Sequence, residues 1–228
     1  MSNPRILVVD DEPQIQRFLK VALAAAGYDA LSAETGAQAL KLFVNKAPDV
    51  VVLDLGLPDR DGKDVLRDIR ALSKVPVIIL SARDREAEKI EALDLGADDY
   101  VEKPFGIGEL MARLRTAMRH AGGAAALPSV FAKDGLVVDQ ERRLVTRDGA
   151  PVKLTPKEYD LLTTLVRHAG RVVTHRQILG EVWGPAHAED TQYLRVFIGQ
   201  LRAKIERDPS APTIIRTEPG VGYRMIEA

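Results

Sequence analysis

The stretch Val50-Val51-Val52-Leu53-Asp54-Leu55-Gly56-Leu57-Pro58-Asp59-Arg60-Asp61-Gly62 decides the fold. Its first four residues are consecutive and apolar, which is typical of a strand buried on both faces of a parallel sheet. The strand ends in the carboxylate of Asp54, and Pro58 and Gly62 then predict a loop. Open α/β sheets bind ligands beyond the carboxyl ends of their strands. Taken alone, however, Asp54 is explained more simply as a helix cap or a loop charge.

The same alternation of strands and helices runs through the first 120 residues. Further strands are predicted at 6–9, 29–32 and 77–81, with a last one ending at Lys103. Amphipathic helices are predicted between them and after the last strand, at about 13–26, 36–45, 63–70, 84–95 and 107–119. This pattern predicts an α/β fold with a five-stranded, doubly wound parallel sheet.

Polar side chains follow four of the predicted strands: Asp10 and Asp11, Asp54, Ser81, and Lys103. Right-handed crossovers bring these strand ends to one edge of the sheet. Neighbouring carboxylates repel each other and need a cation, and oxygen ligands without His or Cys favour Mg²⁺. Ser81 and Lys103 are then suited to bind a phosphoryl group, and Asp54 is the candidate nucleophile for an aspartyl phosphate. Each residue alone has a simpler explanation as a cap or surface charge, but five together favour a site.

The composition is that of a globular chain: 228 residues, 46% hydrophobic and 29% charged, without cysteine. The sequence has no apolar run of membrane-spanning length and no secretory segment at its start, so we expect a cytoplasmic protein without a membrane partner. The net charge of −1 is unevenly divided. Residues 1–120 hold 17 Lys or Arg against 20 Asp or Glu, and residues 121–228 hold 15 against 13, an asymmetry too small to establish a nucleic-acid partner.

The motifs Asp10-Asp11, Asp54 with Leu57-Pro58 and Asp61-Gly62, Ser81-Ala82 and Lys103-Pro104-Phe105 resemble the receiver domain of two-component response regulators over about residues 4–120. The resemblance implies phosphorylation of Asp54 by a sensor histidine kinase. It implies that Asp10, Asp11, Asp54 and the backbone carbonyl of Gly56 hold Mg²⁺. It also implies a switch pair of Ser81, in place of the commoner Thr, and Tyr100, with Lys103 contacting the phosphoryl group.

The alternative for this half is an enzyme with an aspartyl nucleophile, such as a haloacid-dehalogenase-like phosphatase. Those enzymes carry a second acid two residues after the nucleophile. Gly56 occupies that position and cannot transfer a proton, so we predict that the chain is not an enzyme.

Charges of both signs lie on the predicted elements between residues 84 and 119. In the transcription-factor branch of the response regulators, similar positions form a two-fold dimer interface. The resemblance implies the pairs Lys89–Glu109 and Asp99–Arg113, and a third between Asp98 and residue 120, where this chain has His120. The alternative is an ordinary solvated surface.

Residues 121–128 are uncharged and contain two glycines and a proline, which predicts a linker. Beyond it, residues 136–139, 144–147 and 152–154 predict a small antiparallel sheet. Thr155 and Thr174 are predicted to cap two helices. A third helix, at about 190–206, is followed by a hairpin with a glycine-rich tip. We therefore expect domains at 1–120 and 129–228.

The third helix carries the best functional signal of this half. One side is an apolar stripe, and the other has short or amide side chains flanked by basic ones, which suits a DNA major groove. The candidate DNA contacts on this helix are Gln192, Tyr193, Arg195, Val196, Gln200, Arg202 and Lys204. An ordinary surface helix is the alternative.

The motifs 154–158, 176–179, 182–184, 201–204 and 220–224 resemble the winged-helix output domain of the OmpR/PhoB family of response regulators. The resemblance implies that Arg224 enters the minor groove, that the loop from Trp183 to Asp190 contacts RNA polymerase, and that phosphorylation drives homodimerisation on promoter DNA. Shorter segments, such as 182–185 and 193–195, are similar to regulators of high-affinity potassium-transport (Kdp) operons. The alternatives are another regulon of the same family, or a second domain that binds only protein.

Overall fold

The computed structural model describes residues 3–82, 86–121 and 130–227. The chain divides into two compact units, Met1–Gly123 and Ala124–Ala228, and each is described by itself. The expected linker at 121–128 lies outside the described residues apart from Ala121, the last residue of a helix. None of the described helices combines the length and apolar character that a membrane span requires.

The first unit alternates strands with helices, as predicted. The strands are β1 (Arg5–Val9), β2 (Asp29–Ala33), β3 (Val50–Asp54), β4 (Val77–Ala82) and β5 (Asp99–Lys103). The helices are α1 (Pro13–Ala25), α2 (Gly36–Lys46), α3 (Gly62–Leu72), α4 (Glu86–Asp94) and α5 (Ile107–Ala121). The strands form one sheet in the order β2-β1-β3-β4-β5, and every neighbouring pair is parallel. The predicted doubly wound fold is confirmed.

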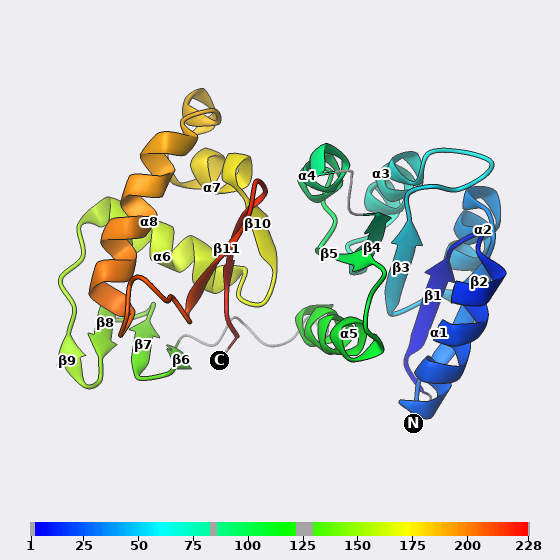
Figure 1. The fold of residues 1–228 in the computed structure, drawn as a ribbon, viewed down its shortest axis with the longest axis horizontal. Coiled ribbons are helices and arrows are strands. Elements are labelled where there is room, and N and C mark those ends of the chain that lie inside the picture. The colour runs from blue at the N-terminus through cyan, green and yellow to red at the C-terminus, as the bar shows by residue number, and fades with distance from the viewer. Residues whose placement is uncertain (1–2, 83–85, 122–129, 228) are drawn as a thin grey trace. The chain divides into compact units, whose positions relative to one another are not determined.

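β3 lies at the centre of this sheet, and all of its residues are buried, as its apolar run predicts. One face of the sheet packs on α1 and α5 through a shared apolar cluster that includes Leu19, Leu23, Leu110 and Leu114. The arrowheads of β1 and β3 point to the same edge of the sheet (Figure 1). The residues that end these strands are therefore brought together there.

The second unit contains two small sheets and three α-helices in its described residues. The antiparallel sheet β6-β7-β8-β9 is formed by Val130–Lys133, Leu136–Asp139, Leu144–Arg147 and Ala150–Pro151. The helices are α6 (Pro156–Arg167), α7 (His175–Val182) and α8 (Thr191–Ile205), with the short 3-10 helix η1 (Pro185–His187) before α8. The second sheet has the order β10-β12-β11, formed by Val172–Thr174, Gly222–Met225 and Ile215–Glu218.

The predicted strand at 152–154 is wrong. The strand there is β9, which ends at Pro151, and only the Val152 N–H continues toward β8, donating to Val145 O at 2.8 Å. Val152 and Leu154 turn toward the apolar core instead, and the capping box of α6 begins at Thr155. The strand thus ends at Pro151 because the next residues pack against the core and form the cap of α6.

Both predicted helix caps of this unit are present. Thr155 and Glu158 form a capping box at α6, and Thr174 and Gln177 form another at α7. Their backbone and side-chain bonds satisfy N–H groups that a helix start otherwise leaves without partners. α8 then buries Leu194, Ile198 and further apolar residues against α6 and α7, which fixes the side it turns to solvent.

Candidate functional site

Three carboxylates meet at the carboxyl ends of β1 and β3. Asp54 is the last residue of β3, and Asp10 and Asp11 directly follow β1. Asp10 is fully buried, Asp54 is 9% exposed and Asp11 is exposed to solvent. One carboxylate oxygen from each residue lies within 4.8 Å of the other two. The structure thus brings together the three acids that the sequence singled out.

Lys103, at the end of β5, extends its ammonium group into this acidic cluster. Its Nζ lies 2.8 Å from Asp10 Oδ2 and 3.3 Å from Asp54 Oδ1. It also lies 3.1 Å from Glu12 Oε1, a fourth carboxylate that the sequence reasoning missed. The only signal for Glu12 was its position between Asp11 and Pro13, where it also serves as the N-cap of α1.

Burial and charge set the protonation of these groups. Burial is the main cause that raises the pKa of Asp54, and the negative charges of Asp10 and Asp11 add to it, while the Lys103 ammonium opposes the rise without cancelling it. Burial lowers the pKa of Lys103, but its hydrogen bond to Asp10 and the nearby carboxylates outweigh this and raise it overall. The lysine therefore stays protonated, and one ammonium faces several carboxylates.

The donor set fits a hard divalent cation. Its atoms are all carboxylate oxygens, the repulsion between them is only partly relieved by Lys103, and Asp11 is open to solvent. The backbone of Gly56 runs past the same carboxylate, since a Cβ added to Gly56 would lie 3.5 Å from Asp54 Oδ2. The groups that could hold Mg²⁺ are thus the carboxylates of Asp10, Asp11 and Asp54 and the carbonyl of Gly56. The ion would neutralise the negative charge of the cluster and of the oxygens of an incoming phosphoryl group.

The two predicted switch residues lie on neighbouring strands. Ser81 is in β4, paired in register with Glu102 of β5, and its side chain lies outside the described part of the chain. Tyr100 of β5 is buried, with the Lys89 ammonium 5.0 Å from the centre of its ring. A cation over an aromatic face favours this inward position of the ring.

The predicted dimer residues have partners within their own chain. Arg113 contacts both Asp99 and Glu109 at 2.7 Å. Asp98 pairs with Arg70 at 2.8 Å, and Lys89, which is buried, pairs with Glu102. The side chain of His120 lies outside the described residues.

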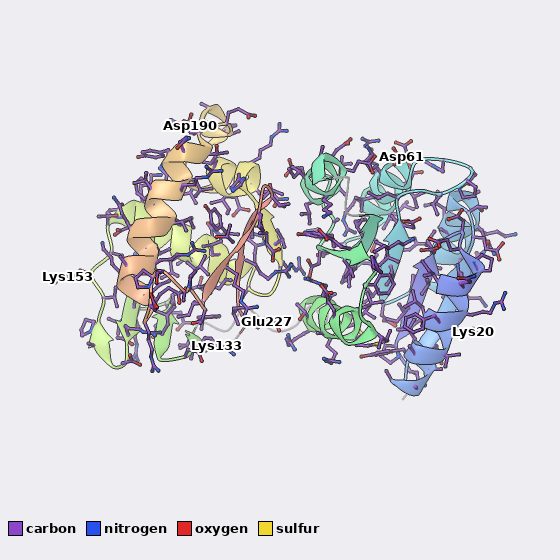
Figure 2. All side chains as sticks on the ribbon, in the orientation of Figure 1. Lys20, Asp61, Lys133, Lys153, Asp190 and Glu227 are labelled. Carbon is purple, nitrogen blue, oxygen red and sulfur yellow. The ribbon has the colours of Figure 1, made fainter. Side chains whose placement is uncertain are left out.

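The outer side of α8 carries most of the predicted DNA contacts. Gln192, Tyr193, Arg195, Val196 and Gln200 are all exposed, while Leu194, Ile198 and Leu201 face the core. Figure 2 labels Asp190, the residue that precedes this helix. Arg195 and both glutamines form no hydrogen bond or ion pair with any residue that the structure describes, so their polar groups are available to a ligand.

The remaining predicted DNA contacts are bonded inside the fold. The Arg202 guanidinium donates to Ile215 O through Nη2 at 2.6 Å, and Lys204 Nζ lies 2.6 Å from Glu158 Oε2. The Arg224 guanidinium, on β12, lies 2.7 Å from Glu218 Oε1 and donates to Gly170 O at 2.7 Å. To reach DNA as predicted, each of these cations would have to exchange such a contact for a phosphate or a base.

His175 lies close enough to α8 to be affected by the charge of Arg195, and the sequence did not single it out as a candidate site residue. His175, the first residue of α7, packs edge-on against the Tyr223 ring, with centroids 5.5 Å apart. Burial and the positive charge of Arg195 lower the pKa of His175. Its only signal in the sequence was its place after the cap Thr174, where a helix start offers N–H groups to an anion.

Each of the two units matches a known protein family. The family described as "Response regulator receiver domain" matches residues 6–115, and the family "Transcriptional regulatory protein, C terminal" matches residues 149–225. The chain belongs to the two-component response regulators of the OmpR/PhoB type.

Within that class, the chain is similar to transcriptional regulatory protein KdpE of Mycobacterium tuberculosis, with 51% identity over 96% of this chain and 97% of that protein. It is also similar to the KDP operon transcriptional regulatory protein KdpE of Escherichia coli, with 49% identity over 97% and 98%. Among solved structures, the OmpR/PhoB homologue DrrB of Thermotoga maritima matches with a TM-score of 0.52 and 30% identity, over 98% of this chain and 99% of that one.

Proposed function

We propose that this chain is a transcription regulator switched by phosphorylation of Asp54. The single observation that carries the proposal is the buried Asp54 carboxylate, held beside Asp10, Asp11 and the Lys103 ammonium at the open edge of the sheet. A sensor histidine kinase supplies the phosphoryl group. The N–P bond of its phosphohistidine breaks, an O–P bond to Asp54 forms, and the histidine takes up a proton as it leaves.

Each group of the cluster has a task in that transfer. Asp10, Asp11 and the Gly56 carbonyl would hold Mg²⁺ together with Asp54, and the bound ion would supply positive charge for the oxygens of the transferred group. Lys103 already bridges Asp10 and Asp54, so it can follow the charge onto a new phosphoryl oxygen. Ser81 and Tyr100 then report the phosphorylated state by the positions of their side chains.

The second unit binds promoter DNA through α8 in this proposal. The exposed Gln192 and Gln200 suit base edges in the major groove, and Arg195 suits phosphate. Tyr193 and Val196 add contact area between them. Arg202, Lys204 and Arg224 act from bonded positions, so we assign them first to holding the helix and the C-terminal hairpin and only second to contacting DNA.

Phosphorylation changes DNA affinity by favouring a dimer of the first unit. The face of α4, β5 and α5, with Lys89, Asp98, Asp99, Glu109 and Arg113, is the proposed interface. Formation of the dimer exchanges contacts inside each chain for contacts between chains. The loop from Trp183 to Asp190 is the proposed contact for RNA polymerase.

The proposed targets are potassium-transport genes of the Kdp type. This rests on the likeness over nearly the full chain to proteins named as KdpE, one of them a regulator of the KDP operon. Another regulon of the same family is the alternative.

Two measurements test this proposal. Incubation with acetyl phosphate and Mg²⁺ is expected to add one phosphoryl group by intact-mass spectrometry, and Asp54→Asn is expected to remove that gain. A gel-shift titration on a Kdp-type promoter is expected to show tighter binding after phosphorylation. A mass gain that survives Asp54→Asn, or equal binding to unrelated DNA, contradicts the corresponding half.

A further inference from the structure

The loop between β3 and α3, residues 55–61, is pinched closed at its base. The Gly62 N–H donates to Leu55 O at 3.0 Å. A Cβ added to Gly62 would lie 2.4 Å from Asp54 O, so only glycine allows the chain to pass this close to the phosphoacceptor. Asp61 then caps α3 by accepting the Lys63 N–H, and Figure 2 places Asp61 at that helix start.

At its far side the loop is fastened to a different helix. Asp59 Oδ1 accepts the Gly36 N–H at 2.8 Å, and Asp59 Oδ2 accepts the Ala37 N–H at 3.0 Å. These N–H groups belong to the first turn of α2 and have no partner within that helix. The two bonds hold the pKa of the Asp59 carboxyl below its usual range, so it is ionised whenever the site is in use.

α2 does not need Asp59 as an ordinary cap. Thr35 already occupies the N-cap position and accepts the Gln38 N–H at 3.2 Å. Asp59 lies 23 residues beyond Gly36 in the sequence and provides a second cap for α2 from a different part of the chain. Gly36 makes room for this approach, because a Cβ there would meet Arg60 and Val65 within 3 Å. The contact is thus built from both sides.

We propose that Asp59 is a positioning residue for the phosphorylation site. By tying the middle of loop 55–61 to α2, while Gly62 ties its base to β3, it fixes the backbone of Gly56 beside the Asp54 carboxylate. The consequence is a preformed arrangement of the Gly56 carbonyl and Asp54, so that Mg²⁺ binds without first ordering the loop. The inference rests on the proposed function of Asp54.

The two caps of α2 allow a matched test in the full chain. Asp59→Ala removes the cap that also holds the loop, and Thr35→Ala removes the cap that belongs to α2 alone. Both variants are expected to lower the thermal midpoint by a few degrees through the lost cap. Only Asp59→Ala is expected to weaken Mg²⁺ binding in isothermal titration calorimetry, by about tenfold, the lower end of the effect of groups that orient metal ligands. Asp59→Asn keeps one acceptor and is expected to fall between.

Phosphorylation by acetyl phosphate gives a second readout, and it is expected to slow at limiting Mg²⁺ and to recover at saturating Mg²⁺ in Asp59→Ala. Equal Mg²⁺ affinities in Asp59→Ala and the parent, or an equal loss in Thr35→Ala, overturn the positioning role and leave the proposed function intact. A parent protein whose Mg²⁺ binding does not depend on Asp54 overturns the proposed function, and the positioning role with it.

Discussion

Replacing Lys103 with Met tests how the acidic cluster is held together before Mg²⁺ binds. The substitution keeps most of the volume of the side chain and removes its charge. The ammonium is the cation that bridges Asp10 and Asp54, at 2.8 and 3.3 Å. Without it, the buried Asp10 carboxylate keeps the Glu12 N–H on Oδ1 and loses its cation on Oδ2.

The expected loss follows from the burial of the partners. Removing one member of a fully buried ion pair costs about 3–5 kcal/mol, and exposed pairs contribute about 0–1 kcal/mol. The Asp10 side chain has no exposed surface, whereas Asp54 and Lys103 keep 13% and 16%. We therefore expect Lys103→Met to lower the free energy of unfolding by about 2–3 kcal/mol without metal. In saturating Mg²⁺ the deficit is expected to shrink by at least about 1 kcal/mol, because the ion supplies the charge that the lysine no longer does.

Urea denaturation of the first unit at about pH 7.5, with EDTA or with Mg²⁺, measures both quantities. Lys20→Met is the control, because Lys20 is an exposed lysine of α1 that projects away from the ribbon (Figure 2). It is expected to change stability by less than about 0.5 kcal/mol in either condition. A deficit of the same size with and without Mg²⁺ would refute the idea that the ammonium and the metal neutralise the same oxygens.

Three further predictions concern the second unit. Gln200→Ala is expected to cost about 1–3 kcal/mol of specific DNA affinity and to relax the sequence preference, while Arg195→Ala is expected to weaken binding to all DNA sequences alike and to reduce the salt dependence of binding by about one counterion. Fluorescence anisotropy at several salt concentrations measures both effects. Arg142→Ala, on the turn after β7, is the control and should change neither. Glu206→Ala leaves three backbone N–H groups at the start of β11 without their acceptor, so we expect the free energy of unfolding, measured with denaturant, to fall by about 3–5 kcal/mol. A fall below about 1 kcal/mol would show that other groups easily replace those hydrogen bonds. His168 has a pKa lowered by burial, so its neutral form is favoured in the folded state. Its contribution is therefore complete above the unfolded value of 6.5 and is lost as pH falls below it, and the thermal midpoint should fall less between about pH 7.5 and 5.5 in His168→Asn than in the parent.

The first unit could be predicted almost completely from the sequence, because β1, β3 and β4 contain short apolar runs and the strands alternate with helices that are mostly amphipathic. The second unit was harder. β10 and β9 are only three and two residues long, and their pairing depends on partners far along the chain rather than on any local pattern. Val172 and Val173 appeared in the sequence only as residues before a helix cap, and the pairing of β10 with the C-terminal hairpin is what makes them a strand.

The grouping of the acids in the candidate site could also be predicted, and the reason again lies in the parallel sheet. Parallel strands place their ends together, so acids at the ends of β1 and β3 could be grouped without coordinates. Asp59 and Glu206 could not be found this way, because each binds backbone N–H groups of a distant segment, and every residue type except proline offers such a group. Their sequence neighbourhoods resemble those of ordinary loop and helix-end acids.

The charges of the second unit also bear on the proposal that two copies bind DNA together. Residues 121–228 hold 15 Lys or Arg against 13 Asp or Glu, and some of these cations are already used inside the fold. Lys204 and Arg224 bind carboxylates, and Arg202 binds a backbone carbonyl. A cation held in this way gains less from a phosphate than a solvated one, so a single copy would release few counterions and bind weakly. In the proposed function, joining two copies would raise affinity through effective concentration, so internal pairing of the cations would make DNA binding depend on the dimer and, through it, on Asp54.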